Sequence, residues 1–184
     1  MRTLCCATVL AGLALLASAP ALPAADDFKL EEGFKLLFNG KDLTGWKTQK
    51  DNESLDGKTE AYKGRFKVSD GKLVIDEKIK GDLRIVTAQE FAKDVHIKFE
   101  FLPGKGCNND LLIRGLKFDL KTPDIKNLKE GEWNTFEIII KGDKAEFKCN
   151  GETQRTGMTK GGPTPLTLRA ELGPVEIRRI RVKE

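Results

Sequence analysis

Residues 94–102 read Asp-Val-His-Ile-Lys-Phe-Glu-Phe-Leu, and their hydrophobicity alternates from one position to the next. Apolar side chains occupy every second position from Val95 to Phe101, and the positions between them are polar or charged. A period of two residues is typical of a β-strand with one face on a core and the other on water. The same alternation recurs in residues 133–141 and 144–149, so the pattern is general.

Short turn signals separate the runs of this kind. Ser69-Asp70-Gly71 and Lys141-Gly142-Asp143 each join two runs and predict β-hairpins. The last run changes phase near Arg178-Arg179, which predicts a β-bulge. Residues 47–63 are polar and predict a surface loop or an extended excursion. The remaining strand-like runs cover residues 34–38, 65–68, 72–76, 83–87, 110–114, 117–120, 165–170 and 174–183.

We therefore expect about eleven or twelve short strands and no amphipathic helix longer than a turn or two. A single flat sheet of that size would expose too many apolar faces, so the pattern predicts an all-β fold in which two antiparallel sheets form a β-sandwich. The chain has 184 residues, of which 39% are hydrophobic and 33% charged, and its net charge is +4. These values are typical of one globular domain.

Residues 1–25 have the layout of a secretory signal peptide. Arg2 precedes an uncharged apolar run, and small residues suited to cleavage follow near positions 19–25. The run is short for a membrane-spanning helix, although an uncleaved anchor is the alternative. We expect a secreted or periplasmic protein whose single domain covers residues 26–184, with no membrane span in the mature chain.

Removal of the leader leaves two cysteines, Cys107 and Cys149. In an oxidising compartment they could form one disulfide, or both could be small buried thiols. Cys149 shares a strand phase with Ala145 and Phe147, which suits a core position. The distance between the two residues decides this question, and the sequence leaves it open.

Several classes of chemistry are excluded by what the chain lacks. The single histidine, His96, rules out metalloproteases with two histidine ligands, and no cysteine or histidine pair has zinc-site spacing. Ser54 and Ser69 are the only serines after the leader, and neither lies in a nucleophile elbow. No glycine-rich phosphate loop is present. The basic cluster at residues 178–181 is flanked by acids, so we expect a solvated strand end and no nucleic-acid partner.

Oxygen-rich stretches at residues 51–53 and 108–110 lack the spacing of a calcium loop and are interpreted as turns. No metal site and no cofactor are predicted, although a divalent cation is compatible with the sequence. Six charged residues lie instead on strands or at strand edges. They could bind sugar hydroxyls or act as a base beside an electrophile, or they could simply form cross-strand ion pairs on a wet face. They are Glu100, Asp110, Arg114, Asp119, Arg169 and Glu171.

Three segments resemble the 3-keto-disaccharide hydrolase domain family. Residues 37–46, LFNGKDLTGW, are similar to its opening signature. Residues 131–137, GEWNTFE, resemble its central strand, and residues 173–182, GPVEIRRIRV, resemble its closing strand. The resemblance covers essentially the whole mature chain. It implies a concanavalin A-like jelly roll and a secreted protein that acts on sugars oxidised to a ketone at the third ring carbon.

The resemblance also implies a reaction. A ketone acidifies the proton on the second carbon, a base removes it, and the enolate expels the glycosidic leaving group. We expect a carbohydrate substrate, with Asp119 or Glu171 as the base and Arg114 as its cationic partner. Glu100, Arg169 and Asp110 are the predicted substrate-binding residues. If this interpretation is correct, these side chains should converge in one cleft.

The chain departs from the family pattern at the positions that matter most. Asn109-Asp110 stand in place of Ser-Gly, Phe118-Asp119 in place of Tyr-Glu, and Arg169 and Glu171 in place of Gln and His. The usual long excursion is reduced to residues 121–130. Short loops exclude water poorly, which favours the alternative of a non-catalytic carbohydrate-binding module. A structural or adhesive surface module is a third interpretation.

Overall fold

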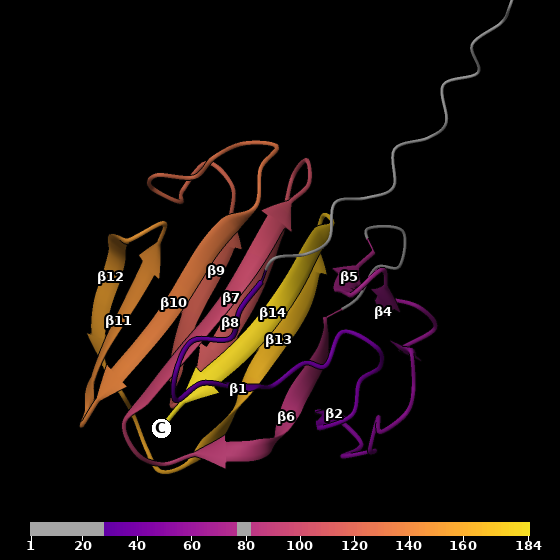
Figure 1. The fold of residues 1–184 in the computed structure, drawn as a ribbon, viewed down its shortest axis with the longest axis horizontal. Coiled ribbons are helices and arrows are strands. Elements are labelled where there is room, and N and C mark those ends of the chain that lie inside the picture. The colour runs from indigo at the N-terminus through magenta and orange to yellow at the C-terminus, as the bar shows by residue number, and fades with distance from the viewer. Residues whose placement is uncertain (1–27, 77–81) are drawn as a thin grey trace, which may run out of the picture.

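The structure is a computed structural model that describes residues 28–76 and 82–184. Within these residues, fourteen strands form two antiparallel sheets that pack face to face (Figure 1). This confirms the predicted concanavalin A-like jelly-roll β-sandwich. Helices of the length and hydrophobicity needed to cross a membrane are absent from the described residues. The predicted signal peptide, residues 1–25, lies outside them.

One sheet, called here the larger sheet, has eight strands in a continuous order and a ninth beside β14. The ninth is β1 (Lys35–Leu36), which lies along the C-terminal part of β14. The order of the other strands is β12 (Glu152–Met158), β11 (Lys144–Cys149), β10 (Asn134–Lys141), β7 (Val95–Pro103), β14 (Val175–Lys183), β5 (Lys72–Ile75), β4 (Phe66–Ser69) and β3 (Glu60–Ala61).

The other sheet, called here the smaller sheet, has five strands. Their order is β2 (Trp46–Thr48), β6 (Leu83–Phe91), β13 (Thr164–Leu172), β8 (Asn108–Ile113) and β9 (Leu116–Lys121). The chain moves from one sheet to the other between β5 and β6, again between β7 and β8, and repeatedly thereafter. Each layer therefore contains strands that are distant in sequence, as expected for a jelly roll.

Phenylalanine side chains join the two layers. The ring of Phe118, on β9 of the smaller sheet, lies 4.8 Å from the ring of Phe136, on β10 of the larger sheet. Phe136 also stacks on Phe99 of β7 at 5.3 Å, and Phe118 stacks on Phe147 of β11 at 5.3 Å. These inward positions are the apolar phase of the alternation in the sequence, because side chains on a strand point to its two faces in turn.

The two predicted hairpins and the predicted bulge are confirmed. Ser69 pairs with Lys72 across one turn, and Lys141 pairs with Lys144 across the other. The pairing of β14 with β7 shifts register between Arg178 and Arg181, in a segment where the backbone φ of Arg179 is 53°. A residue in this left-handed conformation is typical of such an irregularity.

Two expectations need correction. Residues 47–63 are not simply a surface loop, because they contribute to β2 and form β3, and Leu55 within them is buried. Strand β12 was not predicted at all. It is an edge strand whose side chains are mostly exposed, so it lacks the alternation on which the prediction depended.

The opening signature, residues 37–46, builds a turn. The Asn39 side chain accepts hydrogen bonds from the backbone N–H groups of Lys41 and Asp42 at 2.7 and 3.0 Å. At the end of the signature the buried Trp46 donates its indole N–H to the Leu37 carbonyl at 2.8 Å. The polar residues of this motif therefore satisfy backbone groups of the turn, which explains their spacing.

The disulfide left open by the sequence is not formed. Among the described residues, Cys107 and Cys149 are both free and buried. The Cys107 thiol donates to the Leu120 carbonyl at 3.2 Å, and burial raises its pKa. Cys149 occupies the core position that its strand phase predicts, and burial raises its pKa to about 11.

Candidate functional site

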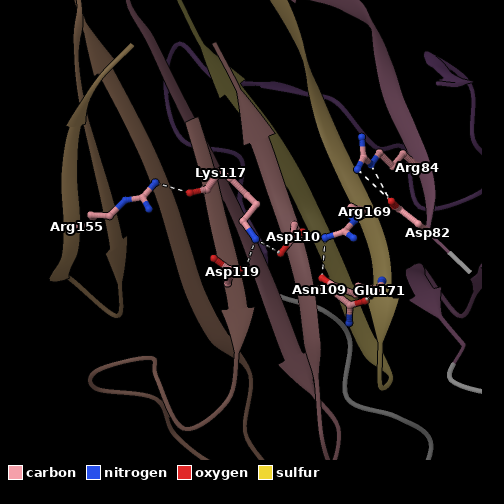
Figure 2. A network of polar contacts seen from close by, with 9 residues as sticks. All are labelled: Asp82, Arg84, Asn109, Asp110, Lys117, Asp119, Arg155, Arg169 and Glu171. Carbon is pink, nitrogen blue, oxygen red and sulfur yellow. Dashed lines mark hydrogen bonds and ion pairs between the residues drawn. The ribbon is translucent and has the colours of Figure 1, made fainter. Parts of the chain in front are cut away.

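The outward face of the smaller sheet carries a row of charged side chains. In the strand register, Arg169 of β13 lies opposite Arg84 of β6 on one side and opposite Asp110 of β8 on the other. Asp110 in turn lies opposite Asp119 of β9. Because directly opposed residues point to the same face and Leu168 points into the core, these four side chains point outward together (Figure 2). We call them, with Asp82, Lys117 and Glu171, the charged row.

Arg169 occupies the centre of the charged row. Its Nε lies 2.6 Å from the Asp82 carboxylate, and its Nη1 lies 2.7 Å from Glu171 and also contacts Asp110 (Figure 2). The hydrogen bonds that Arg169 donates to Asp82 and to Asp110 raise the pKa of Arg169 further, and they lower the pKa of Asp82. Asp82 also contacts Arg84 at 3.2 Å, so it separates the two arginines that the register places opposite each other.

Asp110 and Asp119 form an unequal pair of carboxyl groups. Burial raises the pKa of Asp110, and the neighbouring Asp119 adds to that rise against the opposing effect of Arg169. Burial also acts to raise the pKa of Asp119, but Lys117 and the hydrogen bond with Asp110 outweigh it, and the pKa of Asp119 lies below its ordinary value. Of the two carboxyl groups, Asp110 therefore has the greater tendency to hold a proton, and Asp119 has the greater tendency to stay ionised.

The carboxyl groups of Asp110 and Asp119 also differ in their exposure to solvent. The side chain of Asp110 is 0% exposed, whereas that of Asp119 is 42% exposed. Lys117, on the same face of β9, contacts both carboxylates and is 47% exposed. The Asp119 carboxylate and the Lys117 ammonium are thus accessible together, next to the buried Asp110 carboxyl group.

The Asn109 side chain holds the backbone of the site in place through hydrogen bonds. This buried side chain accepts a hydrogen bond from the Glu171 backbone N–H at 2.9 Å and donates one to the Gly173 carbonyl at 3.1 Å. It does so where the pairing of β8 and β13 shifts register beyond Arg169. Asn109 therefore replaces ladder hydrogen bonds that the irregularity removes, and it holds the backbone that carries Glu171.

The structure brings together four of the six predicted site residues, namely Asp110, Asp119, Arg169 and Glu171 (Figure 2). It does not bring Glu100 to them. Glu100 lies on β7 of the larger sheet, and since Phe99 and Phe101 point into the core, Glu100 points away from the smaller sheet. It pairs there with Arg178 at 2.8 Å and Arg179 at 2.6 Å, so its expected place beside the other five is wrong.

Arg114 also lies apart from the charged row. It occupies the turn between β8 and β9 with a backbone φ of 46°, and the φ of Gly115 after it is 73°. Its buried side chain donates to the Lys93 carbonyl at 3.4 Å. In this turn Arg114 contacts backbone instead of carboxylates, and the expectation that it would converge with them is wrong.

Sequence reasoning missed Lys117, Asp82 and Arg84. Lys117 had a detectable signal, because it lies two residues before Asp119 on the same strand and so on the same face. Asp82 and Arg84 come close to Arg169 only through the pairing of β6 with β13. Asp82 and Arg169, for example, are 87 positions apart in the sequence. No local pattern in the sequence indicates that these residues lie close together in the fold.

A hollow of about 460 Å³ opens beside Asp119. Its lining comes from β8, β9, β12 and the segment after β9, and consists of Asn108, Phe118, Asp119, Lys121, Asp124, Gln154 and Arg155. A larger hollow of about 750 Å³ lies on β10, β11 and β12, but it is mainly apolar and contains no member of the charged row. We therefore take the hollow beside Asp119 as part of the candidate site.

Each carboxylate of the charged row lies in contact with a side-chain cation. Lys117 lies between Asp110 and Asp119, and Arg169 lies among Asp82, Asp110 and Glu171. In the described part of the chain, no group of three or more histidine, cysteine, aspartate and glutamate side chains is arranged to hold a metal ion. The chemistry available from these residues is proton transfer beside fixed cations.

Several solved structures share this fold. A candidate glycosyl hydrolase from Parabacteroides distasonis ATCC 8503 has a TM-score of 0.66 and 19% identity, over 83% of this chain and 94% of its own. A second one from the same organism has a TM-score of 0.62 and 14% identity, over 82% and 98%. The carbohydrate-binding module CBM66 from Bacillus subtilis has a TM-score of 0.54 and 10% identity, over 77% and 96%. At these identities the likeness concerns the fold.

No curated protein matches the sequence. A family model does match it, over residues 33–126, which is just over half of the chain. The matched part includes the opening signature, strand β8 with Asp110 and strand β9 with Asp119. The chain therefore belongs to the family of the 3-keto-alpha-glucoside-1,2-lyase-like domain.

Proposed function

We propose that this protein cleaves 3-keto-glycosides, with Asp119 as the base that removes the proton from the second ring carbon. The proposal is supported by the family and, above all, by one observation: the Asp119 carboxylate is accessible, at 42% exposure, and lies in contact with the Lys117 ammonium on the outward face of the smaller sheet. A base must be ionised and reachable, and Asp119 meets both conditions.

The reaction proceeds by elimination followed by addition. Asp119 takes the proton from carbon 2, and the electrons of that bond form an enolate with the ketone at carbon 3. The enolate re-forms the ketone, a double bond forms between carbons 1 and 2, and the bond from carbon 1 to the leaving oxygen breaks. The leaving oxygen takes up a proton, and water then adds across the double bond, so the net result is hydrolysis.

The two cations of the charged row have different roles. Arg169 is 18% exposed and is held by three carboxylates, so it fixes the positions of Asp110 and Glu171. Lys117 is the more exposed cation, and it is placed to stabilise the negative oxygen of the enolate. Asp110 does not reach the surface and acts as a positioning residue that keeps Asp119 ionised.

The test uses 4-nitrophenyl 3-keto-glucoside, whose cleavage releases a coloured product. We expect the wild-type protein to release nitrophenol and Asp119→Asn to lower kcat by about 10²- to 10⁴-fold, the usual worth of a general base. Asp143→Asn, in the exposed β10–β11 turn, is the control and should leave kcat unchanged. Glu171→Gln distinguishes the second predicted base, because full loss in Glu171→Gln with activity retained in Asp119→Asn would assign the role to Glu171.

One observation favours a second function, a carbohydrate-binding module without catalysis. The ionic groups of the charged row form ion pairs with one another, as they would on a surface that only binds hydroxyl groups. Wild-type protein that releases no nitrophenol yet binds the same keto-glucoside in a calorimetric titration would support this function and contradict catalysis.

We further propose that the protein is exported and that residues 1–25 are removed. The layout of these residues supports export, because a charged start, an apolar run and small residues form a cleavable leader. Mass spectrometry of the protein made in a bacterial host with its leader intact tests this. A mature N-terminus between residues 19 and 26 in the secreted or periplasmic fraction is expected, and an intact chain in the cytoplasm would contradict export.

A further inference from the structure

The larger hollow, of about 750 Å³, lies on a different sheet from the charged row. Three neighbouring strands at one end of the larger sheet form it, namely β10, β11 and β12 (Figure 1). Ile138 and Ile140 point into the core, so Ile139 between them points outward and lines the hollow. The larger hollow therefore opens on the outer face of the larger sheet, whereas the charged row lies on the outer face of the smaller sheet.

Two lysines oppose each other at one end of the larger hollow. Lys141 and Lys144 are exposed, line the hollow and lie directly opposite each other where the β10–β11 hairpin closes. Like charges in this position repel each other and destabilise the strand pair. In the described part of the chain neither ammonium forms an ion pair, and Asp143 in the turn between them pairs with neither. An anion between the two ammonium groups would remove the repulsion.

An accessible apolar surface lies next to the two lysines. Met158 is opposite Lys144 on the edge strand β12, and it is 51% exposed. Ile139 is half-buried and lies two residues before Lys141 on the same face of β10. A methionine side chain is flexible and polarisable, so it adapts to an apolar ligand. Covering these two side chains with such a ligand would be favourable, because apolar surface would leave water.

The charge that remains in the larger hollow is positive. Among the described residues that line it, Glu146 is the single acid. The Glu146 carboxylate accepts a hydrogen bond from the Thr153 hydroxyl and lies 3.7 Å from the Lys148 ammonium, so its charge is already compensated. Lys148 and Thr153 both lie farther from the β10–β11 turn than Glu146 does. The larger hollow thus combines an unpaired cationic end with an apolar floor.

We infer that the larger hollow binds a free amphiphilic anion, with a carboxylate between Lys141 and Lys144 and a short apolar chain along Met158 and Ile139. Its volume of about 750 Å³ lies in the range of small-molecule sites. Its concave shape suits a single molecule better than the flat surface of a bilayer. The inference does not depend on the proposed function, because the two sites lie on different sheets.

The experiment uses one methyl group as its reporter. The chain has two methionines, Met1 and Met158, so a protein labelled with ¹³C in the methionine methyl groups has a signal inside the hollow that is simple to assign. Three probes are titrated into the full chain at pH 7. Octanoate has both the charge and the chain, 1-octanol has the chain alone, and acetate has the charge alone.

We expect octanoate to shift the Met158 signal to saturation, and 1-octanol and acetate to bind at least about tenfold more weakly, because each lacks one part of the recognition. The variant Lys141→Gln/Lys144→Gln should lower the affinity for octanoate by about tenfold, because two charge contacts are lost. The matched control is Lys105→Gln/Lys126→Gln, which removes two other exposed charges and should bind octanoate like the wild type. Urea unfolding of both variants checks that they fold, and the comparison of octanoate with 1-octanol tests the role of charge on the wild-type protein alone.

Three results would overturn the inference. The first is an unchanged Met158 signal at saturating octanoate, and the second is equal affinity of octanoate and 1-octanol. The third is equal affinity of the two double variants for octanoate. Sedimentation of the protein with phosphatidylglycerol vesicles, combined with no response to octanoate, would assign this face to a membrane surface instead.

Discussion

Arg181 has more hydrogen-bonding and aromatic partners than its position near the end of the last strand suggests. Arg181 was expected at a solvated strand end, but it is buried, and its guanidinium forms two hydrogen bonds with Glu31, at 2.6 and 2.8 Å. It also lies over the rings of Phe28 and Phe34, at 5.3 and 5.9 Å. The segment before β1 therefore covers this arginine with a carboxylate and two aromatic rings.

The Glu31 carboxylate makes stability depend on pH. Its hydrogen bonds with Arg181 lower its pKa to about 2 from an ordinary value of 4.5. A lowered carboxylate pKa stabilises the folded state above the unfolded pKa, and that contribution is lost as pH falls from about 4.5 toward about 2. Because the side chain is 39% exposed, we discount the effect to about 1 kcal/mol.

Glu31→Gln should therefore be less stable than wild type at pH 7 by about 1 kcal/mol in urea unfolding, with the difference shrinking toward pH 2.5. Glu32→Gln, at the next position and exposed, is the control and should track wild type at both pH values. A Glu31→Gln deficit that stays constant with pH would show that the ion pair is not its source.

At the scale of elements, the connection between β13 and β14 is more constrained than an ordinary turn. Gly173 has a φ of 69°, and a Cβ at this position would lie 2.5 Å from the Gly106 carbonyl oxygen and 2.7 Å from the Cys107 nitrogen. The Gly173 carbonyl also accepts the hydrogen bond from Asn109. The turn at Gly173 is thus in close contact with the backbone that leads into β8, the strand that carries Asp110.

Gly173→Ala should destabilise the fold by about 3 kcal/mol, because the strained φ and a clash with rigid backbone add together. Gly142→Ala is the control, since its φ is 59° and nothing lies within 4 Å of the added carbon. It should cost only about 1 kcal/mol. The measurement is urea unfolding of both variants, and equal losses would show that the close approach at Gly173 is unimportant.

At the scale of the whole molecule, both sheets share one hydrophobic core in the described residues. Phe136 is central to it, because its ring contacts Phe99 and Phe101 in its own sheet and Phe118 in the other. Separation of the two layers would expose these rings together. We therefore expect the sheets to unfold in one cooperative step.

Phe136→Ala should lower the free energy of unfolding by about 3–5 kcal/mol, the usual loss for a large core side chain, with a single transition retained. Phe34→Ala removes a half-buried ring on the outer face of the larger sheet and should cost clearly less. Fluorescence and far-UV circular dichroism followed together test this. Two separated transitions in the wild-type protein would contradict a shared core.

The alternation of apolar and polar residues was sufficient to predict the sandwich, the two hairpins and the bulge at Arg178-Arg179. Burial of one strand face requires this alternation, which is visible in the local sequence. Strand β12 was not predicted for the same reason, because an exposed edge strand has no buried face and therefore lacks the alternation. Neither the free state of the two cysteines nor the position of Glu100 on the outer face of the larger sheet is indicated by such a local pattern.

The grouping of charges was decided by folding. Asp82 and Asp110 contact Arg169, and Asp119 lies opposite Asp110, only because the register of β6, β13, β8 and β9 places them in one row. Register depends on contacts between strands that are far apart in the chain, and a shift of one residue would turn each side chain to the other face. The sequence can therefore name the charged residues, while their pKa values and their common site belong to the folded molecule.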